Sequence, residues 1–210
     1  CSTEQYSQAF TATDLSVLEK KQQIVLIGSN VRHEQPMVSH RIRKASLSQA
    51  QVSSINPQEF NFNFQLSFSE VTADIVSCTM QLAKAVGVEH SILNSIIVSD
   101  SIATLAQQLK ATDNGVFFLG AYALEHPQSM TLRWLVEAMS QVIGYTVGFL
   151  SQGANTPGAW KAGVLPHRDV RGALLSEPGK TVQKLFGDEP VRAYILLNLD
   201  PECDVAQSAG

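Results

Sequence analysis

Two short, continuous apolar runs limit the folds that are open to this chain of 210 residues. Ile24–Ile27 and Val116–Leu119 each hold four apolar residues in a row, and each run ends at a glycine, Gly28 or Gly120. Four residues are too few for a helix, and unbroken apolar character is typical of a strand buried on both faces. Such strands occur mainly in parallel sheets that are covered by helices on both sides. The runs therefore predict an α/β fold.

Helically spaced apolar residues alternate with these and with other strand-like segments. Helices are expected from Pro36 to Leu47 and over Val71–Val86, Ser101–Lys110, Met130–Val142 and Val182–Phe186. Further strands are expected over Val52–Ile55, Phe60–Phe68, Thr146–Leu150 and Ala193–Leu197. Residues 151–171 show no sustained period and are expected to form a long loop. The alternation predicts a doubly wound, mostly parallel, Rossmann-like sheet with helices on both faces.

Composition and charge exclude several classes of protein. Apolar residues make up 44% of the sequence and charged residues 16%, as in a folded globular protein. The net charge is −4 and no dense basic block is present, so we expect no nucleic-acid partner. The cluster His40–Lys44 fits a solvated helix face. No apolar run approaches the ~20 residues that span a bilayer. We expect one domain over residues 1–210, in which residues 1–22 are a lead-in.

The three cysteines give no metal or disulfide pattern. Cys1, Cys78 and Cys203 are far apart and odd in number, which favours reduced thiols and a cytoplasmic protein. Cys78 belongs to a helical apolar stripe and is expected to be buried. A first residue of cysteine would also suit a mature bacterial lipoprotein, and hence a ligand-binding module of periplasmic type. The buried-sheet pattern favours the alternative, an excised piece of a longer chain.

Two loops qualify as candidate binding sites, because ligands of doubly wound sheets bind beyond the carboxyl ends of the strands. The first is Gly28-Ser29-Asn30, after the first strand, and the second is Asn198-Leu199-Asp200-Pro201, after the last expected strand. Neither is a dinucleotide fingerprint or a P-loop.

No set of residues suggests catalysis. The sequence has no G-x-S-x-G elbow, no H-E-x-x-H motif and no pair of carboxylates suited to acid/base chemistry. The histidines are scattered and are expected to be surface or capping residues: His33, His40, His90, His126 and His167. We therefore predict no catalytic residue and no metal site in this chain.

Several segments, in order along the chain, resemble the large iron-sulfur subunit (G chain) of bacterial NADH:quinone oxidoreductase, respiratory complex I. The first are Ile24–Pro36, with Gly-Ser-Asn at its centre, and His40–Ala45. The segments that follow are Ile55-Asn56-Pro57 with Phe60–Phe62, Leu119-Gly120 with His126-Pro127, Gly153–Asn155 with Gly158–Trp160, and Tyr194–Leu197 with Asp200–Asp204. No single element is specific, but the set is.

The resemblance implies a molybdopterin oxidoreductase domain, similar in fold to the formate dehydrogenase and DMSO reductase group. In enzymes that hold a molybdopterin guanine dinucleotide, two loops with a Gly-x-Asn-Pro pattern cradle the cofactor. Here Val31 replaces the proline of the first loop, while Asn198 and Asp200 replace the glycine and the asparagine of the second. An aspartate adds a negative charge and removes an amide donor, both unfavourable beside a phosphate. Gly28, Ser29, Asn30, Asn198 and Asp200 are therefore interpreted as vestigial cofactor-binding loops, with no molybdopterin and no other cofactor expected here.

For function, the resemblance implies a parent enzyme that passes electrons from NADH through 4Fe-4S clusters to quinone, coupled to proton translocation. The cysteine motifs for those clusters lie ahead of this region in the family. The chain itself is expected to be a non-catalytic scaffold that packs against other subunits of the peripheral arm. It would then be cytoplasmic, held at the inner membrane only through the complex. The alternative is a domain that retains a molybdopterin or nucleotide cofactor.

Overall fold

The structure of the chain is a computed structural model, which describes residues 14–151, 153, 155–170, 173–186 and 191–200. Contacts divide the chain into two compact units, Cys1–Ala154 and Asn155–Gly210, which are described separately. The expected single domain stays a prediction. The expectations for Cys1 and Cys203 fall outside the described residues.

The first unit alternates helices and strands. Its strands are β1 (Gln23–Ile27), β2 (Gln51–Asn56), β3 (Phe68–Val71), β4 (Gly115–Leu119) and β5 (Thr146–Phe149). Its helices are α1 (Leu15–Leu18), α2 (Val31–Glu34), α3 (Pro36–Leu47), α4 (Ile75–Val86), η2 (Ser91–Leu93), α5 (Asp100–Lys110), α6 (Ala121–Glu125) and α7 (Ser129–Ile143).

The strands form one sheet in the order β3-β2-β1-β4-β5, and every neighbouring pair is parallel. Strand β1 pairs with β2 on one side and with β4 on the other, so that Ile27 lies opposite Ile55 and Leu119. The predicted doubly wound α/β fold is thus confirmed, and the sheet of the described residues is parallel throughout.

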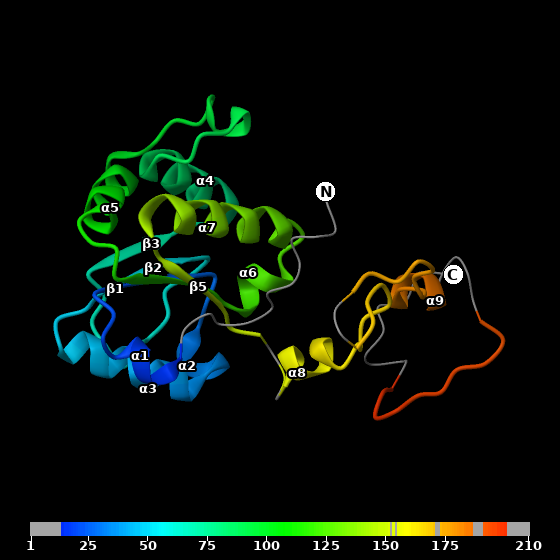
Figure 1. Ribbon diagram of the computed structural model, residues 1–210. Helices are drawn as coiled ribbons and strands as arrows, with labels where there is room; N and C mark the ends of the chain where they lie inside the picture. The colour runs from blue at the N-terminus through cyan, green and yellow to red at the C-terminus, as the bar shows by residue number, and fades with distance from the viewer. Residues whose placement is uncertain (1–13, 152, 154, 171–172, 187–190, 201–210) are drawn as a thin grey trace. The chain divides into compact units, whose positions relative to one another are not determined.

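Helices cover both faces of the sheet: α4, α5 and α7 lie on one side, and α1, α2 and α3 on the other (Figure 1). The side chains of β1 point alternately into the two cores. Val25 and Ile27 join the larger core under α4, α5 and α7, whereas Ile24 and Leu26 join the smaller core over α3. Burial of both faces explains why the runs read as unbroken apolar sequence.

Helix boundaries follow the local signals in most places. Pro36 is the first residue of α3, and Gly87 and Gly144 end α4 and α7 with φ values of 110° and 76°, in the left-handed region that favours glycine. The predicted start of α4 at Val71 is wrong. Val71 ends β3, and the Asp74 side chain caps the helix by accepting a hydrogen bond of 2.9 Å from Ser77 N.

The segment Phe60–Phe68 only partly confirms the predicted strand. Its even-numbered apolar side chains are half-buried and its odd-numbered residues are exposed, as the period of two requires. However, only Phe68 lies in a strand, β3. The rings of Phe62 and Phe64 stack with centroids 5.1 Å apart and pack against the smaller core. The aromatic residues thus contribute burial without joining the hydrogen-bonded ladder.

The second unit contains α8 (Thr156–Lys161) and α9 (Val182–Phe186). Helix α9 was predicted, but α8 lies within the expected loop. The predicted buried strand Ala193–Leu197 is wrong: these residues are exposed, Ile195 by 99% and Leu197 by 90%, and they form no strand. Apolar, strand-favouring sequence makes a strand only where a neighbouring strand pairs with it, and none among the described residues does so.

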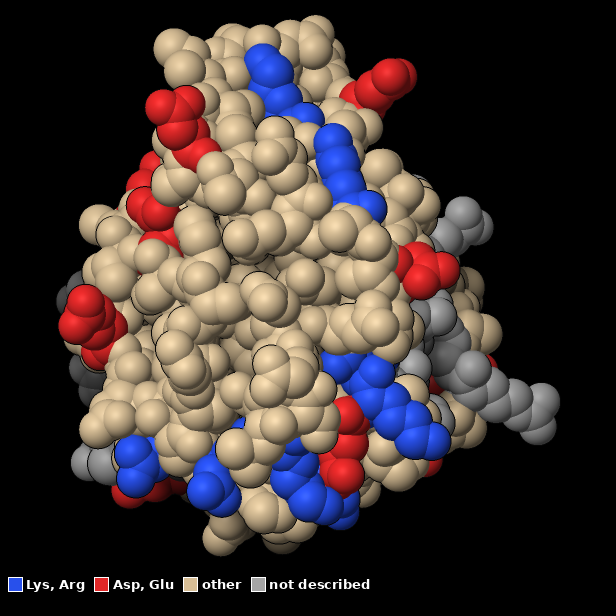
Figure 2. Space-filling model, turned by 90° about the vertical axis from the view of Figure 1, so that its left-hand side faces the viewer, with Lys and Arg blue, Asp and Glu red and all other residues tan. Residues whose placement is uncertain are grey.

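One face of the first unit is shown in Figure 2, where basic side chains gather in the lower part of the view, the level of α1 and α3 in Figure 1. Arg41 and Lys44 on α3 both contact the Glu19 carboxylate, and Arg43 is exposed, while Ile42 between them is fully buried. The basic cluster is therefore the solvated face of a helix, as predicted. In the described part of the chain, no helix is long and apolar enough to cross a membrane.

Candidate functional site

The place where a doubly wound sheet binds ligands lies between β1 and β4. From β1 the chain moves outward through β2 and β3, and it then returns to place β4 on the other side of β1. The loops after β1 and β4 leave in opposite directions from such a switch point, which opens a crevice in many proteins of this class. The first predicted loop, Gly28-Ser29-Asn30, lies here.

In this chain the two loops are packed directly against each other. Gly120 N donates to Ile27 O at 3.0 Å, and Ala123 N donates to Gly28 O at 3.3 Å. A Cβ on Gly120 would lie 2.3 Å from Ser29 Cβ, and a Cβ on Gly28 would lie 2.7 Å from Ala123 N. Gly28 also has a φ of 57°, which favours glycine. Both glycines are thus required by a close approach of backbones.

Ser29 is fully buried beneath this contact. Its backbone N–H donates to Asn56 Oδ1 at 2.7 Å, so the side chain at the end of β2 fixes the loop after β1. Neighbouring parallel strands end at the same edge of the sheet, which is why Ser29 and Asn56 meet although they are far apart in the sequence.

The carboxylate of Glu34, at the end of α2, takes up the free donors of this edge. It accepts hydrogen bonds from Asn30 N at 2.6 Å, from Ser29 Oγ at 3.0 Å and from Ala121 N at 3.1 Å. The first two donors are on the loop after β1, and the third is the backbone N–H of the first residue of α6, after β4. We call these three donors the edge cradle. One internal anion thus fills the edge cradle, where an anionic ligand of such a sheet would be expected.

Two polar atoms at this edge are buried without a partner among the described residues. They are Asn30 Oδ1 and Asn56 Nδ2. Asn56 is only 2% exposed, and its other amide atom holds Ser29 N. A buried polar atom without a partner costs about 1–3 kcal/mol, so this edge carries hydrogen-bonding capacity that the chain does not use.

The second predicted loop, with Asn198 and Asp200, belongs to the second unit. Both residues are exposed, and Asn198 has a φ of 54°. Because Ala193–Leu197 is not a buried strand, this loop does not follow the carboxyl end of a strand as predicted. Its role in binding stays a prediction.

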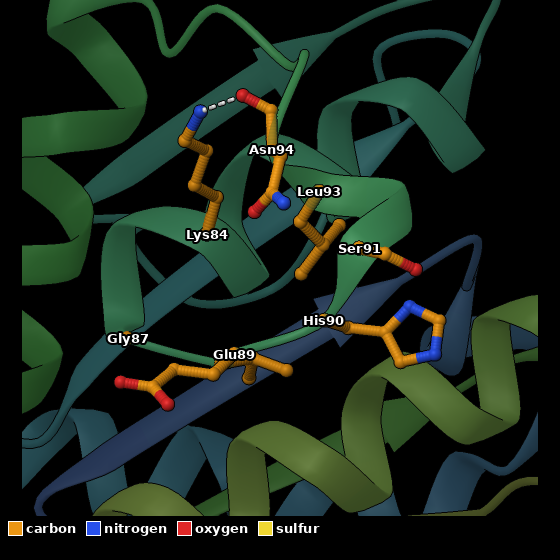
Figure 3. A pocket seen from close by; sticks show the side chains of 8 residues that line it. Lys84, Gly87, Glu89, His90, Ser91, Leu93 and Asn94 are labelled. Carbon is orange, nitrogen blue, oxygen red and sulfur yellow. Dashed lines mark hydrogen bonds between the residues drawn. The ribbon is translucent and has the colours of Figure 1, made fainter.

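An open hollow of about 520 Å³ lies elsewhere in the first unit, between the end of α4 and η2. In Figure 3 the Lys84 ammonium points to the backbone of Asn94, and the His90 ring projects from the loop before η2. Lys84 Nζ donates to Asn94 O and Ile96 O, both at 2.8 Å. His90 Nδ1 accepts from Ile92 N, and its ring contacts Trp134 edge-on. These groups hold the segment after α4 in place, and nothing about them suggests chemistry.

Other reactive side chains have structural roles. Burial raises the pKa of the Cys78 thiol to about 12, so that the thiolate is not available near neutral pH. His126 Nδ1 accepts from Gln128 N at 3.1 Å, a local cap as expected for the histidines. Within the residues described, no three His, Cys, Asp or Glu side chains are grouped as a metal would require.

The sequence pattern predicted the first loop but not the roles of Glu34 and Asn56. Glu34 lies four residues after Asn30, a spacing that alone indicates a local helix contact. Its bond to Ala121 N joins residues 87 positions apart and depends on the packing of two loops. An asparagine at the end of a strand-like run, as at Asn56, was the only sequence signal for the second residue.

Comparison with known proteins relates this chain to a protein family and to solved structures. Residues 1–209 match the family described as molybdopterin oxidoreductase. The X-ray crystal structure of the formyltransferase/hydrolase complex from Methylorubrum extorquens, in complex with methylofuran, contains a chain that is similar to this one at a TM-score of 0.55 and 13% identity. The match covers 83% of this chain and 50% of that chain, so this chain spans about half the length of its neighbour. No curated protein matches.

At 13% identity the structural neighbour speaks for the fold alone. The family match covers nearly the whole chain and agrees with the all-parallel, doubly wound sheet of the first unit. This chain belongs to the molybdopterin oxidoreductase family.

Proposed function

We propose that this chain is a non-catalytic scaffold domain of an NADH:quinone oxidoreductase, in the peripheral arm that carries electrons from NADH to quinone. Family membership supports an origin among oxidoreductases. The narrower assignment rests on the ordered set of segments, from Ile24–Pro36 to Asp200–Asp204, that resemble the large iron-sulfur subunit. On this proposal the chain supplies packing surface to other subunits and reaches the inner membrane only through them.

The observation that carries the proposal is the internal anion of the edge cradle. A molybdopterin guanine dinucleotide carries phosphates, and a doubly wound sheet offers such groups the free N–H donors beyond its strands. Here the Glu34 carboxylate already accepts from Ser29 Oγ, Asn30 N and Ala121 N. A phosphate beside that carboxylate would meet like charge at short range. The residues present therefore do not fit the phosphate of the cofactor.

A specific observation favours a second function, a domain that retains a molybdopterin or nucleotide cofactor. The buried Asn30 Oδ1 and Asn56 Nδ2 lack partners among the described residues, and a ligand with its own donors and acceptors would satisfy them. This alternative requires Glu34 to leave the edge cradle when the ligand binds.

Two measurements on the natural, full-length gene product separate the functions. Affinity purification of a tagged chain from membranes of its host is expected to recover NADH-oxidising, iron-sulfur subunits in fixed stoichiometry. Acid extraction of the purified protein is expected to release no fluorescent pterin and no guanine nucleotide, and metal analysis to find no molybdenum. Stoichiometric pterin or nucleotide would overturn the scaffold proposal and establish the alternative. Recovery without any NADH-oxidising partner would contradict the assignment to this complex.

A further inference from the structure

The contacts of Glu34 go beyond the cap of one short helix. A glutamate four residues after an N-cap commonly contacts the preceding loop, and the bonds to Ser29 Oγ and Asn30 N are of this local kind. The bond of 3.1 Å to Ala121 N is not, because Ala121 follows β4 on the other side of the switch point. A carboxylate that bridges both loops occupies the position of a ligand rather than that of a cap.

Two further observations indicate that the edge is built for an anion. First, Ser29 N is held by Asn56 Oδ1 at 2.7 Å, which orients the loop without using Glu34. Second, Asn56 is 2% exposed and its Nδ2 is an unused donor at the same edge. The loop after β1 is therefore held at Ser29 by a contact that does not depend on the carboxylate.

We infer that Glu34 is a built-in anion that keeps phosphate-bearing ligands out of the edge cradle, and that the cradle binds inorganic phosphate once this carboxylate is removed. The inference rests on the proposed loss of the cofactor and names the residue that causes it. Glu34 is only four residues from Asn30 in the chain, so its carboxylate competes as an intramolecular ligand at an effective concentration of at least millimolar order. Free phosphate at millimolar concentration does not displace it. Glu34 itself is only partly buried, so an anion can reach the cradle from solvent.

The test compares Glu34→Ala and Glu34→Gln with the wild type and with Glu59→Ala. Glu59 is exposed and is not the acceptor of any cradle donor, so its removal changes net charge equally without opening the site. Each protein is titrated with inorganic phosphate at constant ionic strength, and backbone amide shifts are followed by NMR. Glu34→Ala is expected to bind phosphate at least tenfold more tightly than the wild type or Glu59→Ala. The largest shifts are expected at the amides of Asn30 and Ala121.

Glu34→Gln keeps the length of the side chain and removes its charge. It is therefore expected to fold, and to bind phosphate more tightly than the wild type but less tightly than Glu34→Ala. If Glu34→Ala and Glu34→Gln fold yet bind phosphate no better than Glu59→Ala, the inference is wrong. It is equally wrong if both variants fail to fold while Glu59→Ala folds, since Glu34 would then be a structural residue only. Neither result bears on co-purification with NADH-oxidising subunits, so a failure here is distinguishable from a failure of the proposed function.

Discussion

Replacement of Gly120 by alanine tests the direct packing of the loops after β1 and β4. A Cβ at this position would lie 2.3 Å from Ser29 Cβ, 2.4 Å from Ser29 Cα and 2.6 Å from Gly28 O. Non-bonded carbon atoms are ordinarily about 3.5–4.0 Å apart, so Ser29 would have to move by about 1 Å. Two of these three atoms belong to the backbone, so a change of rotamer cannot relieve the clash.

The expected loss of stability follows from that clash. Gly120 has φ −89° and ψ −175°, which other residues adopt readily, so the cost of Gly120→Ala is steric and not conformational. Overpacking typically costs about 1–3 kcal/mol, and a clash with backbone belongs at the upper end, about 3 kcal/mol. For a chain of this size that is a fall in Tm of about 6–12 °C. Thermal unfolding followed by circular dichroism measures it.

Gly144→Ala is the matched control. Its Cβ would lie 3.5 Å from Asp113 Cβ, an ordinary contact, and only the left-handed φ of 76° opposes a side chain. The expected cost is about 1–2 kcal/mol, a fall in Tm of about 2–8 °C. If Gly120→Ala destabilises the protein no more than Gly144→Ala does, the two loops are not in contact. The direct packing of the loops after β1 and β4 would then be refuted.

Two further outcomes check the larger core under α4, α5 and α7. Tyr145→Phe removes the hydrogen bond of 2.9 Å from the buried hydroxyl to Leu109 O, so it is expected to lower the free energy of unfolding by about 1 kcal/mol. Urea unfolding is expected to show a lower midpoint at an unchanged m value. An unchanged midpoint would mean that this hydrogen bond contributes nothing to stability. Cys78, whose pKa burial raises to about 12, is expected to resist a thiol reagent at pH 8 in the native protein and to react fully in guanidinium chloride, as followed by peptide mass spectrometry. Rapid labelling of native Cys78 would contradict its burial.

The elements that the sequence predicted correctly are those that depend on burial over two faces. Ile24–Ile27 and Val116–Leu119 lie in β1 and β4 because no solvent-facing position interrupts either run. Gly87 and Gly144 end α4 and α7 because the left-handed φ excludes most side chains. In these cases the residue type alone indicates the local geometry, so the sequence is sufficient to predict the element.

Ala193–Leu197 failed for the opposite reason. Its continuous apolar sequence has the same character as β1, yet the residues are exposed and outside any strand. Pattern alone does not state which neighbour a strand pairs with, and without that ladder an extended segment gains neither hydrogen bonds nor burial. The cradle filled by Glu34 was missed on similar grounds, because its third donor comes from a loop 87 positions away.

The structure also changes which residue accounts for the proposed loss of the cofactor. The sequence directs attention to Val31 and Asp200, which depart from the loop pattern that the resemblance implies. Val31 is fully buried in the smaller core and is the first residue of α2, a position where proline is favoured. Asn30 has φ −102° and ψ 66°, outside the α region that a following proline disfavours. A proline at position 31 would therefore be compatible with α2 and with the hydrogen bonds of Glu34 in the edge cradle.

Val31→Pro and Glu34→Ala are consequently expected to differ in their affinity for inorganic phosphate, although each restores a feature that an anion-binding loop would have. Val31→Pro leaves the carboxylate on Ser29 Oγ, Asn30 N and Ala121 N, so it is expected to bind inorganic phosphate no better than the wild type. If Val31→Pro binds phosphate more tightly than Glu34→Ala in the same NMR titration, the valine at position 31 is what prevents anion binding. If Glu34→Ala binds phosphate more tightly, the charge of Glu34 in the edge cradle prevents anion binding, and the backbone of the loop does not.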